Sequence, residues 1–134
     1  MIESLDSAVG EILDQLDRLN LADSTIVIFS SDNGGVGGYR DAGIDGGQEI
    51  TSQAPLRGGK GMLYEGGIRV PLLMSWPQEF PAGSRCHEPV TSVDFYETLC
   101  HLAGFEPSVA TDGRDFSDWL REPAHPLSDR ALYW

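Results

Sequence analysis

The hydrophobic positions of the first twenty residues follow a helical period. They recur at steps of three and four, while most charged side chains fall on the opposite side. The apolar positions are Ile2, Leu5, Val9, Ile12, Leu13, Leu16 and Leu19. This pattern predicts an amphipathic surface helix over residues 2–19.

Two short apolar runs predict strands. Residues 25–29, "TIVIF", are β-branched or aromatic for the most part and apolar at successive positions, which is typical of a strand buried on both faces. Residues 70–76 predict a second strand, which tolerates Pro71 because that residue lies near its start. A helix that leads directly into a two-sided strand is the unit of a layered sheet. The expected class is therefore α/β, a layered sheet with flanking helices.

A second helix is expected beyond residue 90. Thr91 and Asp94 have the spacing of a capping box, and Gly104 stands where a left-handed C-terminal cap belongs. The tail holds one possible helical turn in residues 112–120 and a strand-like end in residues 130–134, "RALYW".

Between the two strands lies a glycine-rich segment. Residues 34–67 hold 12 of the 16 glycines and show little periodicity. A structureless segment of this length is uncommon in a compact domain and is usually either functional or disordered. Two patterns in and beside it have chemical potential.

The first pattern is Asp32-Asn33, which follows the two serines at the end of the first strand. In open sheets with parallel strands, ligands bind beyond the carboxyl ends of the strands. Carboxylate and amide oxygens are hard donors of the kind that Ca²⁺ and Mg²⁺ take. The alternative is a plain hairpin or Asx-turn, because Asp, Asn and Gly are common turn residues.

The second pattern surrounds Lys60, the only lysine of the chain. It lies between glycines, with Arg57 and Arg69 on either side, so the local charge is positive and an anionic substrate could bind there. The Walker A spacing and the dinucleotide fingerprint both fail against this sequence. A flexible, solvated loop with a chance lysine remains the alternative.

The composition limits the classes of partner that the chain is expected to bind. The 134 residues are about one domain, and the formal net charge is −12 with nine basic residues. Nucleic acid is an unsuitable partner, because its phosphates must be neutralised by Lys and Arg side chains, and this chain has few of them. No apolar run approaches the ~20 residues of a membrane span, so no membrane partner is expected. Cys86 and Cys100 are the only cysteines of the chain, and a disulfide framework would need more. They are therefore expected to be core or loop thiols.

The residues also form a recognisable set. "IVIFSSDNGG", followed by "PLRGGKGMLYEGGIRVPLLMSWP", resembles the C-terminal part of the catalytic domain in the sulfatase family, within the alkaline-phosphatase-like superfamily. The resemblance implies hydrolysis of sulfuric esters by an enzyme that uses a divalent cation, usually Ca²⁺. It implies that Asp32 and Asn33 are metal ligands and that Lys60 is a catalytic residue in contact with the sulfate group. Members of the family are commonly exported.

One part of the family pattern is missing. The formylglycine nucleophile arises from a Cys- or Ser-x-Pro-x-Arg motif, and no such motif occurs in these 134 residues. The three histidines, His87, His101 and His125, match no family motif and receive no role. We therefore expect residues 1–134 to be a partial catalytic domain, with the N-terminal half and most of the C-terminal subdomain absent.

Three further expectations follow from the resemblance. The chain alone is expected to be inactive, and the substrate of the complete enzyme is expected to be a sulfated sugar or an aryl sulfate. Absent neighbouring strands would leave exposed strand edges and promote self-association. The alternatives are a phosphoryl or phosphonate hydrolase of the same superfamily and a non-catalytic remnant that acts as a binding module.

Overall fold

The computed structural model describes residues 1–124 and 129–134, which form two compact units. The helical unit comprises Met1–Thr25 and Ser75–Ala131, and the loop unit comprises Ile26–Met74 and Leu132–Trp134. His125 lies outside the described residues. None of the helices in the described part of the chain is long and apolar enough to cross a membrane.

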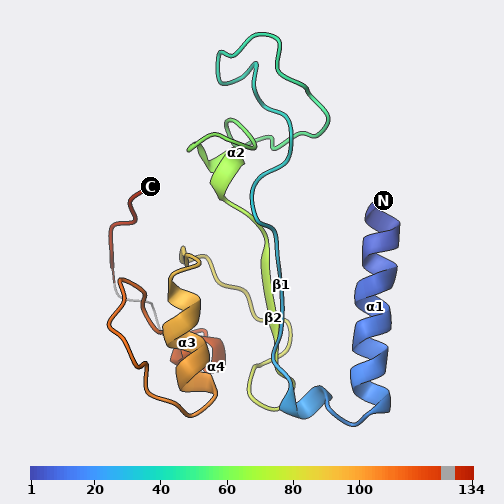
Figure 1. The fold of residues 1–134 in the computed structure, drawn as a ribbon, viewed down its shortest axis with the longest axis vertical. Helices are drawn as coiled ribbons and strands as arrows, with labels where there is room; N and C mark the ends of the chain where they lie inside the picture. Colours follow the sequence, from blue (N-terminus) through green and yellow to red (C-terminus); the bar gives the residue numbers. More distant parts are fainter. Residues whose placement is uncertain (125–128) are drawn as a thin grey trace. The chain divides into compact units, whose positions relative to one another are not determined.

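The first predicted helix is confirmed as α1, Ile2–Arg18, in the helical unit (Figure 1). Its apolar side chains remain largely exposed, and α1 buries no residue. A short 3₁₀ turn, η1 (Ala22–Ser24), follows the helix, and the Trp76 indole Nε1 donates to the Asp23 carbonyl at 2.6 Å. This hydrogen bond joins the two chain segments of the helical unit.

The second helix is confirmed as α3, Asp94–Leu102. Half of the expected capping box forms, because the Thr91 N–H donates to Asp94 Oδ2 at 2.8 Å without a reciprocal side-chain bond. Gly104 has φ +77°, and the N–H groups of Gly104 and Phe105 donate to the carbonyls of His101 and Cys100. These two bonds make the complete glycine-capped helix end that the sequence predicted.

The core of the helical unit lies between α3 and α4, Ser117–Arg121, which confirms the predicted turn. Leu102, Phe116 and Leu120 are its buried apolar residues, and the Phe116 N–H donates to Thr98 Oγ1 at 3.1 Å. The strand expected at residues 130–134 does not form: these residues are irregular. No described strand pairs with them, and the Trp134 indole instead donates to the Leu63 carbonyl at 3.0 Å.

The loop unit is built on a two-stranded sheet of β1, Val27–Ser30, and β2, Leu72–Ser75 (Figure 1). Both predicted strands exist with shifted bounds. Thr25 is outside β1 because its hydroxyl and N–H bond back to η1. The pair is antiparallel, since Ser30 Oγ donates to the Pro71 carbonyl at 2.9 Å and the Gly34 N–H to the Gly67 carbonyl at 2.8 Å. The argument from parallel strand ends therefore does not apply to this pair.

Candidate functional site

The first predicted site residues lie immediately after β1. Ser31 Oγ donates to the Asn33 carbonyl, and Asn33 Nδ2 donates to the Gly34 carbonyl, each at 2.9 Å. Asp32 is exposed and Asn33 is half-buried. Because the Asn33 amide nitrogen donates to Gly34, its Oδ1 is the side-chain atom that is left to act as an acceptor or ligand. The turn alternative is thus partly realised, and two oxygen donors still remain at the strand end.

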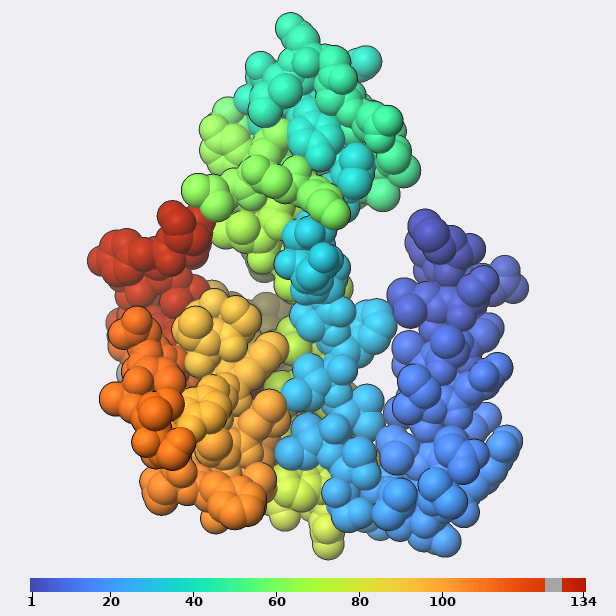
Figure 2. Space-filling model, viewed as in Figure 1, coloured from blue at the N-terminus to red at the C-terminus, as the bar shows by residue number. Residues whose placement is uncertain are grey.

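Glycines bring this strand end against the segment that carries Lys60. A Cβ atom on Gly34 would overlap the carbonyl oxygen of Gly66, and one on Gly59 would overlap that of Gly37. Figure 2 shows the glycine-rich loops, coloured cyan to light green, packed against one another. Such backbone-to-backbone approach is possible only without side chains. Several of the glycines in residues 34–67 are therefore required for packing within the loop unit, whereas an added Cβ on Gly43, Gly46 or Gly61 would meet nothing within 4 Å.

Lys60 is held by its main chain while its side chain is exposed. Its N–H donates to the Gly35 carbonyl at 2.9 Å, and its carbonyl accepts the Tyr39 hydroxyl at 3.0 Å. The first bond places the Lys60 peptide within three residues of Asp32 along the facing segment. The main chain of Lys60 is thus hydrogen-bonded to two other segments of the loop unit.

The two arginines of the same loop have partners. Arg69 forms an ion pair with Glu65 at 2.9 Å, one turn apart across α2, Glu65–Ile68. The Arg57 guanidinium stacks over the Tyr64 ring at 4.0 Å from its centroid. Among the described residues, Lys60 takes part in no ion pair. Its ammonium is consequently the loop cation that remains open to an external anion.

The oxygen donors suit a hard cation, yet they are too few to hold one. Ca²⁺ takes six to eight oxygen ligands, whereas Asp32 and Asn33 offer two side chains. Within the described residues, no three His, Cys, Asp or Glu side chains gather closely enough to bind a metal. A cation at this strand end would need further ligands from outside the residues described.

Sequence reasoning missed two residues of the loop unit, Tyr39 and Glu49. The Glu49 carboxylate accepts the N–H groups of Gly38, Tyr39 and Arg40 at 2.7, 3.0 and 3.1 Å. These backbone hydrogen bonds, with those from Arg40 and Gly38 the strongest, lower the pKa of Glu49. No short-range pattern signals the pairing, because about ten residues separate the carboxylate from its donors.

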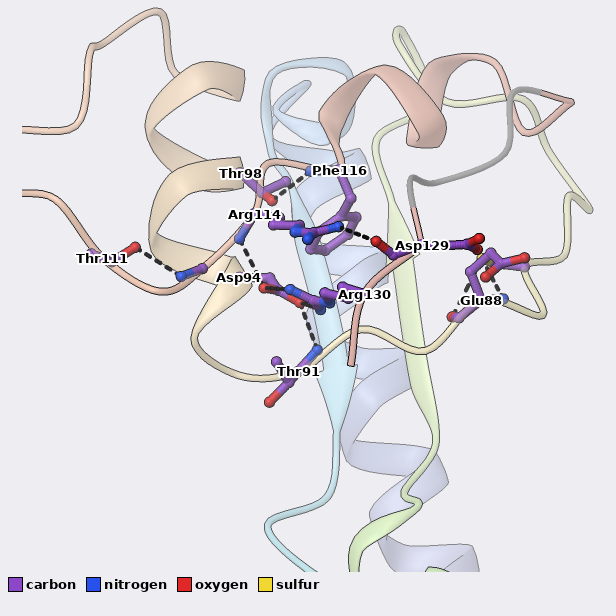
Figure 3. A network of polar contacts seen from close by, with 11 residues as sticks. Glu88, Thr91, Asp94, Thr98, Thr111, Arg114, Phe116, Asp129 and Arg130 are labelled. Carbon is purple, nitrogen blue, oxygen red and sulfur yellow. Dashed lines mark hydrogen bonds and ion pairs between the residues drawn. The ribbon is translucent and has the colours of Figure 1, made fainter. Parts of the chain in front are cut away.

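A buried polar network occupies the helical unit (Figure 3). Asp94, only 1% exposed, is paired with the Arg130 guanidinium and also accepts the N–H groups of Thr91 and Arg114. Burial raises the pKa of Asp94, whereas these hydrogen bonds lower it by a larger amount. The net pKa of Asp94 is therefore below its usual value. A pocket of about 100 Å³ borders the network. Both oxygens of the Asp94 carboxylate have hydrogen-bond partners, which indicates a structural role.

His101 belongs to the same unit, at the exposed end of α3. Its Nδ1 lies 2.8 Å from Asp115 Oδ2, and its Nε2 lies 3.7 Å from Glu106 Oε2. The hydrogen bond with Asp115, followed by the charges of both carboxylates, raises the pKa of His101. The histidine thus has partners within its own unit and is not among the residues of the loop unit that the sequence singled out.

Comparison with known proteins identifies the class. Residues 1–105 match the family model described as Sulfatase, so this chain belongs to the sulfatase family. It is 40% identical over 134 residues to the steryl-sulfatase of Mus musculus, covering 98% of this chain and 21% of that protein. It is 33% identical to the N-acetylgalactosamine-6-sulfatase of Homo sapiens, covering 99% and 24%.

Solved structures agree with the family assignment. The PsFucS1 sulfatase from Pseudoalteromonas sp. superposes with a TM-score of 0.70 at 30% identity, over 88% of this chain and 23% of that one. Ps i-CgsB in complex with k-i-k-neocarrahexaose gives a TM-score of 0.70 at 36% identity, over 89% and 25%. The chain therefore has the fold of part of a sulfatase, and it spans about a fifth to a quarter of the length of these relatives.

Proposed function

We propose that this chain supplies part of the catalytic domain of a sulfuric ester hydrolase. The carrying observation is the glycine-built junction, in which the Lys60 N–H meets the Gly35 carbonyl next to the Asp32-Asn33 strand end. An exposed ammonium and two hard oxygen donors thereby share one ordered loop cluster. Family membership supports sulfate esters over the phosphoryl and phosphonate alternatives.

In this proposal Asp32 and Asn33 are two ligands of a divalent cation, Ca²⁺ in most of the family. When bound, such a cation would polarise the oxygens of the sulfate group. The remaining ligands and the formylglycine nucleophile would come from residues that these 134 do not include. The layered sheet expected from the sequence would form when β1 and β2 join further strands.

Lys60 has the direct chemical task among the residues of this chain. Its ammonium would contact a sulfate oxygen and stabilise negative charge that develops on the sulfuryl group or the bridging oxygen. Hydrogen bonds at both the N–H and the carbonyl of Lys60 support a pre-organised position for this lysine. Relatives are named for sterol and N-acetylgalactosamine sulfates; the substrate class proposed here is a sulfated sugar or an aryl sulfate.

The test is turnover of nitrophenyl sulfate. The chain alone should show none, since groups that act as a unit leave little rate when one part is present. Combined with a polypeptide that carries the matured formylglycine, it should gain activity. Lys60→Ala should then lower kcat/KM roughly 10²-fold or more, which corresponds to about 3 kcal/mol of lost transition-state stabilisation. Lys60→Arg should restore little of this activity, because a planar guanidinium does not replace a compact ammonium.

A matched control is available in the same loop. Arg69→Ala removes a cation that already has Glu65 as its partner, so kcat/KM should change little. If Lys60→Ala and Arg69→Ala behaved alike, the sulfate contact would be misassigned. Turnover by the lone chain that copurifies with the protein and survives Asp32→Ala would overturn both site assignments.

A further inference from the structure

The Lys60 segment has almost no side chains with which to anchor itself. Its neighbours in sequence are Gly58, Gly59 and Gly61, and Gly58 and Gly61 adopt φ of +76° and +84°. Glycines add backbone freedom that must be removed if the lysine is to hold one position. Only hydrogen bonds can supply that restraint here. The two that meet the Lys60 peptide come from Gly35 and Tyr39.

The Tyr39 side chain is itself held in place. A Cβ atom on Gly47 would lie 2.7 Å from three atoms of the Tyr39 side chain, which shows how closely that backbone covers the ring. The Tyr39 carbonyl accepts the N–H groups of Ala42 and Ile44 at 3.1 and 2.9 Å, and its own N–H donates to Glu49. The phenol hydroxyl is therefore a fixed donor, 21 residues distant in sequence from the carbonyl that it holds.

We propose that Tyr39 is a positioning residue for Lys60. Its hydroxyl fixes the orientation of the Lys60 peptide, and with it the direction in which the lysine side chain leaves the loop. A purely structural residue would need only the ring, which packs against Gly47. The hydroxyl is the part that reaches Lys60. This inference rests on the proposed function only in that the positioned ammonium is the one that meets sulfate.

Tyr39→Phe isolates the hydroxyl, because the ring and its packing remain. Tyr64→Phe is the matched control: it also removes a phenol oxygen from the loop unit, while the ring beneath Arg57 is kept. Since Lys60 is the only lysine, ¹⁵N-lysine labelling gives a single backbone amide signal for the residue in question. In a uniformly ¹⁵N-labelled sample, the amides of α3 report any loss of stability in the helical unit.

The first readout is hydrogen exchange of the Lys60 amide in the full chain. Tyr39→Phe should speed exchange roughly five-fold, as expected for loss of one neutral hydrogen bond. Tyr64→Phe should leave the rate unchanged, and neither variant should alter exchange in α3. An unchanged Lys60 rate in Tyr39→Phe would overturn the inference, as would equal acceleration in α3.

The second readout is titration with inorganic sulfate at constant ionic strength, followed by the Lys60 side-chain signal. Sulfate affinity should fall several-fold in Tyr39→Phe and hold in Tyr64→Phe. Faster exchange with undiminished sulfate affinity would reduce Tyr39 to a structural role and overturn its positioning role. A wild-type Lys60 signal that ignores sulfate, combined with faster exchange in Tyr39→Phe, would overturn the proposed sulfate contact while it supports the restraint by Tyr39.

Discussion

The glycine packing of the loop unit predicts opposite outcomes for one substitution at two helical positions. Gly66 lies in α2, and a Cβ atom there would overlap the Gly58 carbonyl oxygen and lie 2.6 Å from that of Arg57. Gly10 lies in α1, where an added Cβ meets nothing within 4 Å. Both sites accept alanine by helix propensity, which favours Ala over Gly by about 1 kcal/mol. Only the surroundings differ.

The magnitude follows from what must move. Relief of the Gly66→Ala overlap requires α2 to shift away from the 57–58 segment, and this stretches the 2.8 Å hydrogen bond from the Gly66 N–H to the Arg57 carbonyl. Overpacking costs about 1–3 kcal/mol and the hydrogen bond about 1 kcal/mol. After the propensity gain of about 1 kcal/mol, the net loss is about 1–3 kcal/mol. Gly10→Ala should instead stabilise α1 by up to about 1 kcal/mol.

Urea titration followed by residue-specific NMR signals measures both effects. The Lys60 amide reports the loop unit, and amides of α1 report the helical unit. Gly66→Ala should lower the midpoint for Lys60, and Gly10→Ala should raise that for α1 or leave it unchanged. A Gly66→Ala variant as stable as the wild type would refute the claim that these glycines exist for backbone contact.

Three other predictions concern the polar groups. Arg130→Met should cost about 3–5 kcal/mol, because it leaves the Asp94 carboxylate buried without its charge partner; thermal unfolding should show a large drop, and a wild-type melting curve would contradict it. The His101 pKa is raised by Asp115 and Glu106, so its contribution is complete below the ordinary histidine pKa and is lost as pH rises through the raised one; Asp115→Asn should flatten that pH dependence of unfolding. Calorimetry should detect only weak Ca²⁺ binding by this chain, and micromolar affinity abolished by Asp32→Ala would show that further ligands are present.

Elements that are determined by residues close together in the sequence could be predicted from it. The period of α1 and the glycine cap at Gly104 are local signals, and both elements occur as expected. Strand bounds were less accurate, because Thr25 is drawn into η1 by bonds that a strand pattern does not reveal. The "RALYW" end has strand-forming residues without a strand, since sheet structure needs a paired neighbour as well as propensity.

The loop unit depends on contacts between distant residues, and these the sequence concealed. Asp32, Asn33 and Lys60 were identifiable by residue type and by resemblance. Tyr39 and Glu49 were not, since the Tyr39 hydroxyl binds a carbonyl 21 residues away and the Glu49 carboxylate binds N–H groups about ten residues away. The number of glycines could be read from the sequence, but the backbone atoms that each glycine faces could not. The approach of Gly34 to Gly66 continues the antiparallel register of β1 and β2, whereas Gly37, Gly59 and Gly66 face carbonyl oxygens of Thr51, Gly37 and Gly58 within the connecting segment.

The electrostatics of the loop unit explain how an acidic chain could receive a sulfate ester. A net charge of −12 repels the sulfate ester anion at long range, yet physiological salt screens exposed charges beyond about 8 Å. Inside that distance the local groups decide, and Lys60 is flanked in the sequence by Gly59 and Gly61, which carry no charge. Glu65, the one acid of residues 55–71, is already paired with Arg69. The glycine-rich composition therefore lets the backbones of the loop unit approach one another closely, while the Lys60 ammonium takes part in no ion pair with the described residues.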